Sequence, residues 1–265
     1  MQMPVNNFKN ALAEQVPLFG CWAGFATGYA AEIIAGTGFD WLLIDGEHAP
    51  NTVPTILAQL QAVAPYPTAP VVRCVNQDPA LIKQLLDIGA QTLMVPMVES
   101  AEQAAALVRA TRYPPHGIRG VGGGLVRATR WDGVDDYLHK AHESLCLITQ
   151  VESPKGVEHA EAIANTDGVD AIFIGPADLS VGMGHAGNPG HPDVQRAIEK
   201  VIKIVQAAGK PVGILAPLEE DARRYQALGC QFIAVGIDIS LLRQGALSTV
   251  ARYKAHSTQA PSSTY

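Results

Sequence analysis

The chain has 265 residues, a mass of 28.1 kDa, 19 basic and 25 acidic side chains, a formal net charge of −6 and a pI of about 5.7. This acidic balance gives the protein no electrostatic reason to bind nucleic acid or an anionic membrane surface. Because 48% of the residues are apolar and only 17% are charged, one large core can form, which excludes disorder over most of the length.

The sequence also bears on cellular location and on the state of the cysteines. No apolar run approaches the ~20 residues that a membrane span needs. The first residues, MQMPVNNFKNALAEQ, lack the basic and apolar regions of a secretion signal. The four cysteines, Cys21, Cys74, Cys146 and Cys230, are widely spaced and form no C-x-x-C pair. We therefore expect reduced, mostly buried thiols in a cytoplasmic protein.

Along the chain, short β-branched or leucine-rich runs alternate with amphipathic stretches that begin near Pro, Asp or Ser and end near Gly. The predicted strands cover residues 18–22, 41–45, 71–74, 92–96, 145–151, 171–174, 212–215 and 232–235. Predicted helices between them include 78–88, 101–111, 193–208 and 219–228. About eight βα units of roughly 33 residues each predict an α/β protein with a TIM-type (β/α)8 barrel.

The alternative to a closed barrel is an open, doubly wound sheet, which has similar local patterns. The runs WLLI, APVV, AIFI and VGIL indicate strands buried on both faces in either case, so closure rests on the number of units. No internal linker divides the chain, and we expect one domain over 1–255 with a disordered tail over 256–265. The irregular insertion over 113–131 is predicted to be functional or interfacial.

Polar residues follow several of the predicted strands, at the end of a barrel where catalytic groups lie. These residues are Asp45 with Glu47 and His48, then Arg73, then Gln150 and Glu152, and then Asp178. Carboxylates, an imidazole and a guanidinium are therefore expected to converge on one mouth.

Glu152 and Asp178 follow consecutive strands and should be neighbours. Two close carboxylates repel unless one takes up a proton or a cation lies between them. With no His or Cys at the matching positions, the donors are all oxygen, which suits Mg²⁺ or Mn²⁺ better than Zn²⁺. The alternative is that one carboxylate, such as Asp178 before LSVG, only caps a helix.

Arg73 and His48 also allow two interpretations each. Arg73 either forms a structural ion pair with Asp45 or neutralises an oxyanion or a substrate carboxylate. His48 lies in a polar loop, which disfavours a buried core role, and its ordinary pKa near neutrality suits proton transfer.

The residues required for imine chemistry, for phosphate binding and for dinucleotide binding are not found at the expected positions. No lysine is predicted to point into the barrel, which disfavours imine chemistry. The chain has no phosphate-binding G-x-x-x-x-G-K-[ST] motif, and the glycines at 120 and 122–124 do not follow a strand as a dinucleotide fingerprint requires.

Five segments together carry a family resemblance: FDWLLIDGEHAP, QTLMVPM, RYPPHGIRGVG, the Q-x-E at 150–152, and FIGPADLS. In this order they resemble the 4-hydroxy-2-oxoheptane-1,7-dioate aldolase family of class II pyruvate aldolases, over about residues 8–253. The resemblance implies a barrel that uses Mg²⁺, Mn²⁺ or Co²⁺, with its last helix exchanged between subunits of a homohexamer, a trimer of dimers. It also implies cleavage of a 4-hydroxy-2-oxo acid to pyruvate and an aldehyde, which is succinic semialdehyde in the catabolism of aromatic compounds.

The resemblance implies a role for each matching residue. Glu152 and Asp178 look like metal ligands, and Gln150, Ala177 and Asp178 look like pyruvate-binding positions. His48 looks like the proton acceptor, and Arg73 looks like the group that stabilises the enolate. Trp22 and Leu215 look like the lining of the aldehyde site.

Asp87 matches the family carboxylate that raises the basicity of the histidine. Its helix should end at the face opposite the mouth, so on topology alone Asp45 is the nearer partner of His48. Two other functions stay open at this point: an aldolase for sugar acids such as 2-dehydro-3-deoxyglucarate, and a catalytically silent barrel scaffold.

Overall fold

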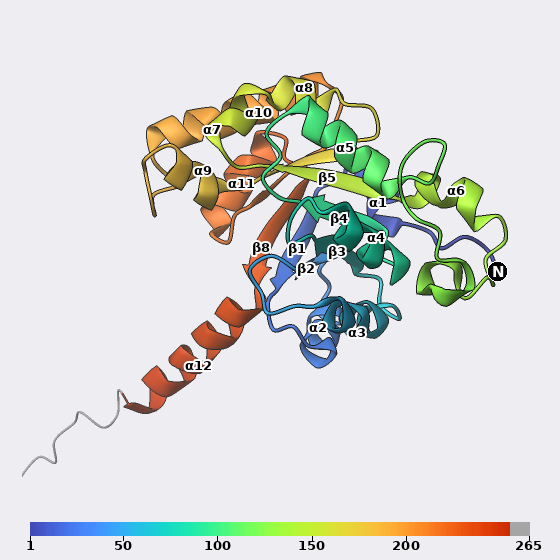
Figure 1. The fold of residues 1–265 in the computed structure, drawn as a ribbon. Helices are drawn as coiled ribbons and strands as arrows, with labels where there is room; N and C mark the ends of the chain where they lie inside the picture. The colour runs from blue at the N-terminus through green and yellow to red at the C-terminus, as the bar shows by residue number, and fades with distance from the viewer. Residues whose placement is uncertain (255–265) are drawn as a thin grey trace, which may run out of the picture.

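The computed structural model describes residues 1–254 and shows eight parallel strands closed into one barrel (Figure 1). The strands follow chain order around the barrel, and β8 pairs with β1 to close it. The prediction of a TIM-type barrel is therefore confirmed against the open sheet. The predicted disordered tail, 256–265, lies outside the described residues.

The strand positions agree with the sequence patterns to within two residues. The strands are β1 Leu18–Ala23, β2 Trp41–Asp45, β3 Ala69–Arg73, β4 Thr92–Val95, β5 Cys146–Val151, β6 Ala171–Ile174, β7 Val212–Leu215 and β8 Phe232–Ile237. The helices are α1 Asn7–Ala13, α2 Gly28–Ala35, α3 Val53–Val63, α4 Pro79–Asp87, α5 Ala101–Thr111, α6 Tyr137–Ser144, α7 Pro154–Glu158, α8 Ala160–Ala164, α9 Pro176–Gly182, α10 Pro192–Ala207, α11 Glu219–Ala227 and α12 Asp238–Lys254.

Local capping chemistry starts the helices that follow the strands. The Asp78 carboxylate accepts a hydrogen bond from the Ala80 N–H at 2.8 Å, and Pro79 occupies the first position of α4. The Ser153 hydroxyl similarly accepts from the Gly156 N–H at 3.0 Å at the start of α7. Both caps lie directly after strands whose ends carry predicted site residues, so they fix the loops of the mouth.

Aromatic rings fill the interior of the barrel. Trp41, Phe173 and Phe232 are fully buried, and their ring centroids lie 5.8–6.5 Å apart. Two strand glycines make room for these rings. A Cβ on Gly20 would lie 2.2 Å from the Trp41 ring, and one on Gly213 would lie 2.4 Å from Phe232. The aliphatic core lies between the barrel and the surrounding helices.

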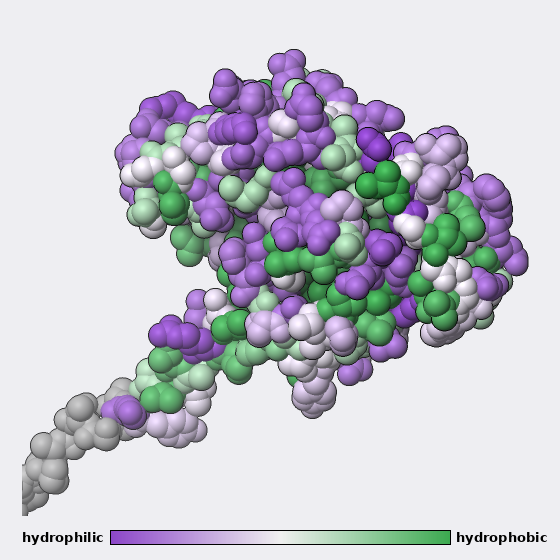
Figure 2. Space-filling view, in the orientation of Figure 1, coloured by the Kyte–Doolittle hydropathy of each residue, from purple (hydrophilic) through white to green (hydrophobic). Residues whose placement is uncertain are grey.

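Helix α12 extends away from the barrel body, following β8 (Figure 1). Apolar side chains are exposed along it (Figure 2), among them Ile239, Leu242, Val250 and Tyr253. The insertion over 113–131 forms two short 3-10 turns, Gly123–Leu125 and Arg127–Thr129, and exposes Leu125 and Trp131. Within residues 1–254, no helix combines the length and the apolar character that crossing a membrane requires.

Candidate active site

A buried ion pair joins the ends of β2 and β3. The strand register places Asp45 opposite Arg73. The Arg73 Nε and Nη2 groups donate to the two Asp45 carboxylate oxygens at 2.8 and 2.6 Å. The Trp22 indole N–H donates to the same carboxylate at 3.3 Å, and the guanidinium lies 5.2 Å from the Trp22 ring centroid. The structural ion pair considered as one interpretation of Arg73 is thus present.

The electrostatics of Asp45 follow from this pairing. Burial works against its negative charge, but the hydrogen bonds and charge of Arg73 outweigh that effect. The backbone N–H groups of Glu47 and His48 add to the stabilisation, so the pKa of Asp45 is lowered from its ordinary value. Asp45 is therefore ionised at neutral pH and holds Arg73 in place.

The loop after β2 brings Glu47 and His48 to the same mouth. Gly46 permits a close approach, since its N–H donates to the Arg73 carbonyl at 2.9 Å and a Cβ there would lie 2.5 Å from that oxygen. Glu47 Oε2 lies 2.8 Å from Arg73 Nη1 and 3.9 Å from His48 Nε2. The His48 side chain is 65% exposed, so its ring is open to a ligand in the mouth.

Glu152 is a buried carboxylate held by two N–H donors. The Met97 backbone N–H donates to its Oε1 at 2.8 Å, and the Gln150 amide donates to its Oε2 at 2.5 Å. The other amide atom, Gln150 Oε1, is buried without a hydrogen-bond partner. The pKa of Glu152 is raised to about 7. Burial is the largest cause and the charges of Asp178 and Glu47 add to it, while the Met97 N–H and Arg73 oppose the rise. Burial, more than the predicted repulsion between carboxylates, disfavours the ionised form of Glu152, and a cation bound beside it would offset that effect.

Asp178 and Ala177 lie in the first turn of α9, and both are exposed. The preceding Gly175 allows this turn to approach Glu152, because a Cβ there would lie 2.4 Å from Glu152 Oε2. An acidic side chain in the first helical turn is also favourable to the helix dipole, so the capping interpretation of Asp178 stays compatible with the geometry. At the ends of β1 and β7, Trp22 and Leu215 pack against the interior aromatic cluster.

Asp87 lies apart from this group. It ends α4, and its carboxylate pairs with Arg119 Nη2 at 2.8 Å. The Arg119 side chain is fully buried and lies 4.5 Å from the Tyr113 ring centroid, which anchors the 113–131 insertion on α4. In the described chain, no hydrogen bond or ion pair joins Asp87 to His48. Asp45 reaches only the His48 backbone N–H, at 3.4 Å, so the carboxylate that acts on the His48 ring stays a prediction.

Met97 and Gln77 belong to the mouth although the sequence patterns did not single them out. Met97 has a φ of 54°, in the left-handed region that few non-glycine residues adopt. The Gln77 amide donates to the Met97 carbonyl at 2.8 Å and to the Pro96 carbonyl at 3.3 Å. These bonds hold the backbone that presents an N–H to Glu152. A backbone group on a methionine leaves no sequence signal.

The fold and the mouth together define a class of protein: a (β/α)8-barrel enzyme whose candidate site combines oxygen donors, a guanidinium and an imidazole. Residues 18–245 match the family described as HpcH/HpaI aldolase/citrate lyase. The chain belongs to this family, and it is a carbon–carbon lyase of the aldolase type.

Named relatives and solved structures agree with this assignment. The chain is 70% identical over 255 residues to the hydroxypyruvate/pyruvate aldolase of Delftia acidovorans, covering 96% of this chain and 95% of the relative. It is 56% identical over 253 residues to the 4-hydroxy-2-oxo-heptane-1,7-dioate aldolase of Klebsiella pneumoniae, covering 96% of each. A family protein from Burkholderia cenocepacia has a TM-score of 0.91 and 42% identity, covering 94% of this chain and all of that one.

A more distant structure shares the fold alone. The protein CitE of Mycobacterium tuberculosis, in complex with magnesium and pyruvate, has a TM-score of 0.56 and 19% identity, covering 84% of this chain and 85% of that one.

Proposed function

We propose that this chain is a divalent-metal-dependent aldolase that cleaves 4-hydroxy-2-oxo acids to pyruvate or hydroxypyruvate and an aldehyde. The observation that carries the proposal is the buried Glu152 carboxylate, whose pKa is raised to about 7, in the same mouth as Arg73 and His48. The names of the relatives support a 2-oxo acid as the common substrate class.

The residues of the mouth fit a hard divalent cation. Glu152 and Asp178 offer carboxylate oxygens, and Gln150 Oε1 is a buried acceptor without a partner. Such an all-oxygen donor set suits Mg²⁺, Mn²⁺ or Co²⁺. The CitE structure, which shares the fold, was solved with magnesium and pyruvate, in line with a divalent cation in this mouth. Bound by Glu152 and Asp178, the cation would supply Lewis-acid stabilisation of negative charge on the 2-oxo acid.

The protein residues account for the remaining chemistry. His48, which is exposed in the mouth, takes the proton of the C4 hydroxyl group. The C3–C4 bond then breaks, its electron pair stays on the pyruvate fragment as an enolate, and the C4 carbon leaves as the aldehyde carbonyl. Arg73 stabilises the negative charge of this enolate, and protonation at C3 completes the formation of pyruvate.

The aldehyde site is proposed to lie at Trp22 and Leu215, the apolar residues at the ends of β1 and β7. Their apolar character favours a weakly hydroxylated aldehyde. Succinic semialdehyde from 4-hydroxy-2-oxoheptane-1,7-dioate, in the catabolism of aromatic compounds, therefore remains our specific candidate. A hydroxylated sugar-acid substrate such as 2-dehydro-3-deoxyglucarate is the competing member of a test panel.

Oligomeric state and location complete the proposal. The family resemblance implies a homohexamer, a trimer of dimers. Exposed apolar side chains on α12 and on the 113–131 insertion support the packing of these segments on a neighbouring subunit. All four cysteines are buried and unpaired, which supports a reducing cytoplasmic location.

A coupled assay for pyruvate over a panel of 4-hydroxy-2-oxo acids tests the function. Treatment with EDTA should abolish cleavage, and Mg²⁺, Mn²⁺ or Co²⁺ should restore it. Activity that survives chelation, together with a covalent adduct trapped by borohydride and pyruvate, would contradict the proposal. Titration calorimetry with Mg²⁺ and pyruvate is the companion measurement, because a silent scaffold binds neither.

A further inference from the structure

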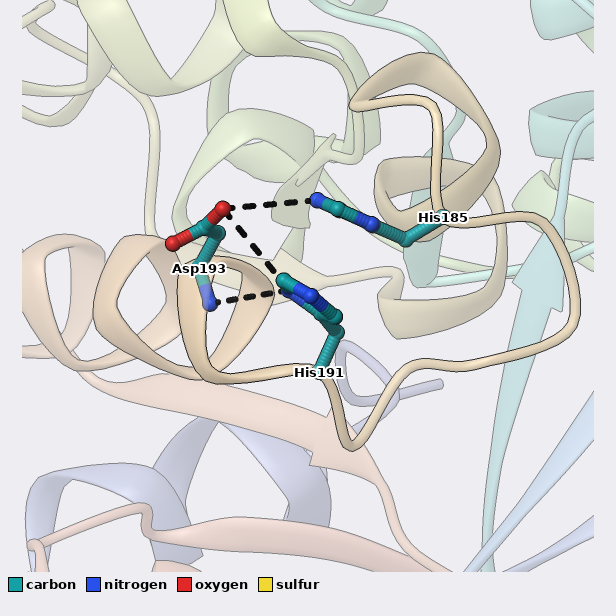
Figure 3. Close-up of side chains that lie close together, drawn as sticks. All are labelled: His185, His191 and Asp193. Carbon is teal, nitrogen blue, oxygen red and sulfur yellow. Dashed lines mark hydrogen bonds and ion pairs between the residues drawn. The ribbon is translucent and has the colours of Figure 1, made fainter.

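A second group of metal-binding side chains lies outside the mouth, between α9 and the start of α10. His185, His191 and Asp193 point toward one another (Figure 3), and their ligand atoms lie within 4.8 Å of one another. Asp193 Oδ2 is 3.5 Å from His185 Nε2 and 3.7 Å from His191 Nδ1. The two imidazole rings stack with their centroids 3.5 Å apart and an interplanar angle of 13°.

The backbone holds these residues in a defined loop. The His185 N–H donates to the Ser180 carbonyl at 2.7 Å, the Asn188 N–H donates to the His185 carbonyl at 2.9 Å, and the His191 N–H donates to the Asn188 carbonyl at 3.1 Å. The three side chains are 26%, 32% and 45% exposed for His185, His191 and Asp193. The cluster is therefore ordered by the chain and still accessible to an ion from solvent.

We propose that His185, His191 and Asp193 form a binding site for a borderline transition-metal cation, with Zn²⁺ as the representative ion. Two imidazoles and one carboxylate are the donor set that Zn²⁺ takes in proteins, with a water in the fourth position. Bond lengths of ~2.0–2.2 Å to a shared ion place tetrahedral ligand atoms roughly 3.4 Å apart, close to the separations from Asp193 Oδ2. The nitrogen-rich donors distinguish this site from the all-oxygen mouth.

Charge at the site favours the carboxylate as the anchoring ligand. Asp193 Oδ1 pairs with the Arg196 guanidinium, which leaves Oδ2 facing the two rings. The N-terminus of α10 carries partial positive charge, so a cation there needs a negative partner, and Asp193 in the first turn supplies it.

Binding also requires a local rearrangement. Stacked parallel rings cannot both aim a lone pair at one ion, and His191 Nδ1 accepts a hydrogen bond from the Asp193 N–H at 3.2 Å as the N-cap of α10. The rings must therefore rotate out of the stack, and the N-cap bond must be released. The bound ion would replace these contacts by tethering the α9–α10 loop directly to α10.

Competition between the full-length protein and a chromophoric chelator for Zn²⁺, in excess Mg²⁺, tests the proposal. His185→Phe keeps a planar ring for stacking but removes one ligand. His191→Asn keeps an N-cap acceptor but removes the other imidazole. Each variant should bind one zinc ion at least about tenfold more weakly than the wild-type chain. His142→Phe, which removes an exposed imidazole elsewhere, is the matched control and should bind like the wild type.

A second readout keeps the test independent of catalysis and of variant folding. In the wild-type chain, Zn²⁺ should shift the ring-nitrogen NMR signals of His185 and His191 and the backbone signal of Asp193, while Mg²⁺ should not. Zinc affinity equal to wild type in both variants, or zinc-dependent shifts confined to residues of the mouth, would overturn the site. Failure of the proposed aldolase activity would leave this result unaffected.

Discussion

Arg73 makes two kinds of contact in the mouth of the barrel, one structural and one available to chemistry. Its Nε and Nη2 groups bind Asp45, while Nη1 lies 2.8 Å from Glu47 Oε2 on the side of His48. Arg73→Lys keeps the charge but loses the planar fork of donors. We expect kcat to fall by roughly 10²-fold, the loss typical of an oxyanion donor. The pyruvate-coupled assay measures it, and an unchanged kcat with a lowered thermal midpoint would leave Arg73 only its ion-pair role.

Gln77 is expected to act on Glu152 through the backbone of Met97. Gln77→Leu removes the two hydrogen bonds that hold the left-handed Met97 residue. The Met97 N–H is then no longer held in position to donate to Glu152. We therefore expect the Mg²⁺ affinity to fall by roughly tenfold, which is within the range of losses seen when residues that support metal ligands are changed. Titration calorimetry measures the change. Gln61→Leu, an exposed change on α3, is the control, and equal affinities in both variants would remove this role from Gln77.

At the scale of elements, α12 carries an apolar stripe at helical spacing. Ile239, Leu242, Ala246, Val250 and Tyr253 recur every three or four residues, and all five are exposed in the described chain. A stripe of this kind on a projecting helix is typical of a surface that is covered by another subunit.

The double variant Leu242→Asp/Val250→Asp should therefore break or shrink the proposed assembly, because charged groups cannot be buried in an apolar contact without cost. Analytical ultracentrifugation measures the mass of the particle. Gln244→Asp, on the other side of α12, should keep the assembly of the wild type. A double variant that still sediments with the wild type would show that α12 does not hold the subunits together.

For the whole molecule, the Asp45–Arg73 pair makes stability depend on acid. The pKa of Asp45 is lower in the folded chain than its ordinary value of 3.8, so the unfolded chain binds more protons in that range. The stabilisation is present above that value and is lost as the pH falls through the folded pKa.

The free energy of unfolding, measured with denaturant from pH 5 down to the lowest pH at which the wild type still folds, should depend less on pH in Asp45→Asn than in the wild type. Asp135→Asn, at a carboxylate that is 95% exposed, is the control. Parallel pH curves for Asp45→Asn and the wild type would contradict the assigned linkage.

The sequence by itself determined the barrel and most of the mouth. Continuous apolar strands and eight repeated units specify the fold because hydrophobic burial on both faces is a local pattern repeated along the chain. The same apolar runs show where each strand ends in the sequence. Arg73, Gln150, Glu152 and Asp178 could therefore be predicted from their positions after these runs.

Only the tertiary structure decided which of these groups touch. The register of β2 against β3 pairs Asp45 with Arg73, and burial shifts the pKa of Glu152. Met97 offers a backbone N–H through a left-handed turn, and His185 meets His191 through a loop. Such contacts depend on the distances between segments that are far apart in the sequence or irregular in structure, and on how deeply the side chains are buried. The residue types and their spacing along the sequence do not predict any one of these contacts.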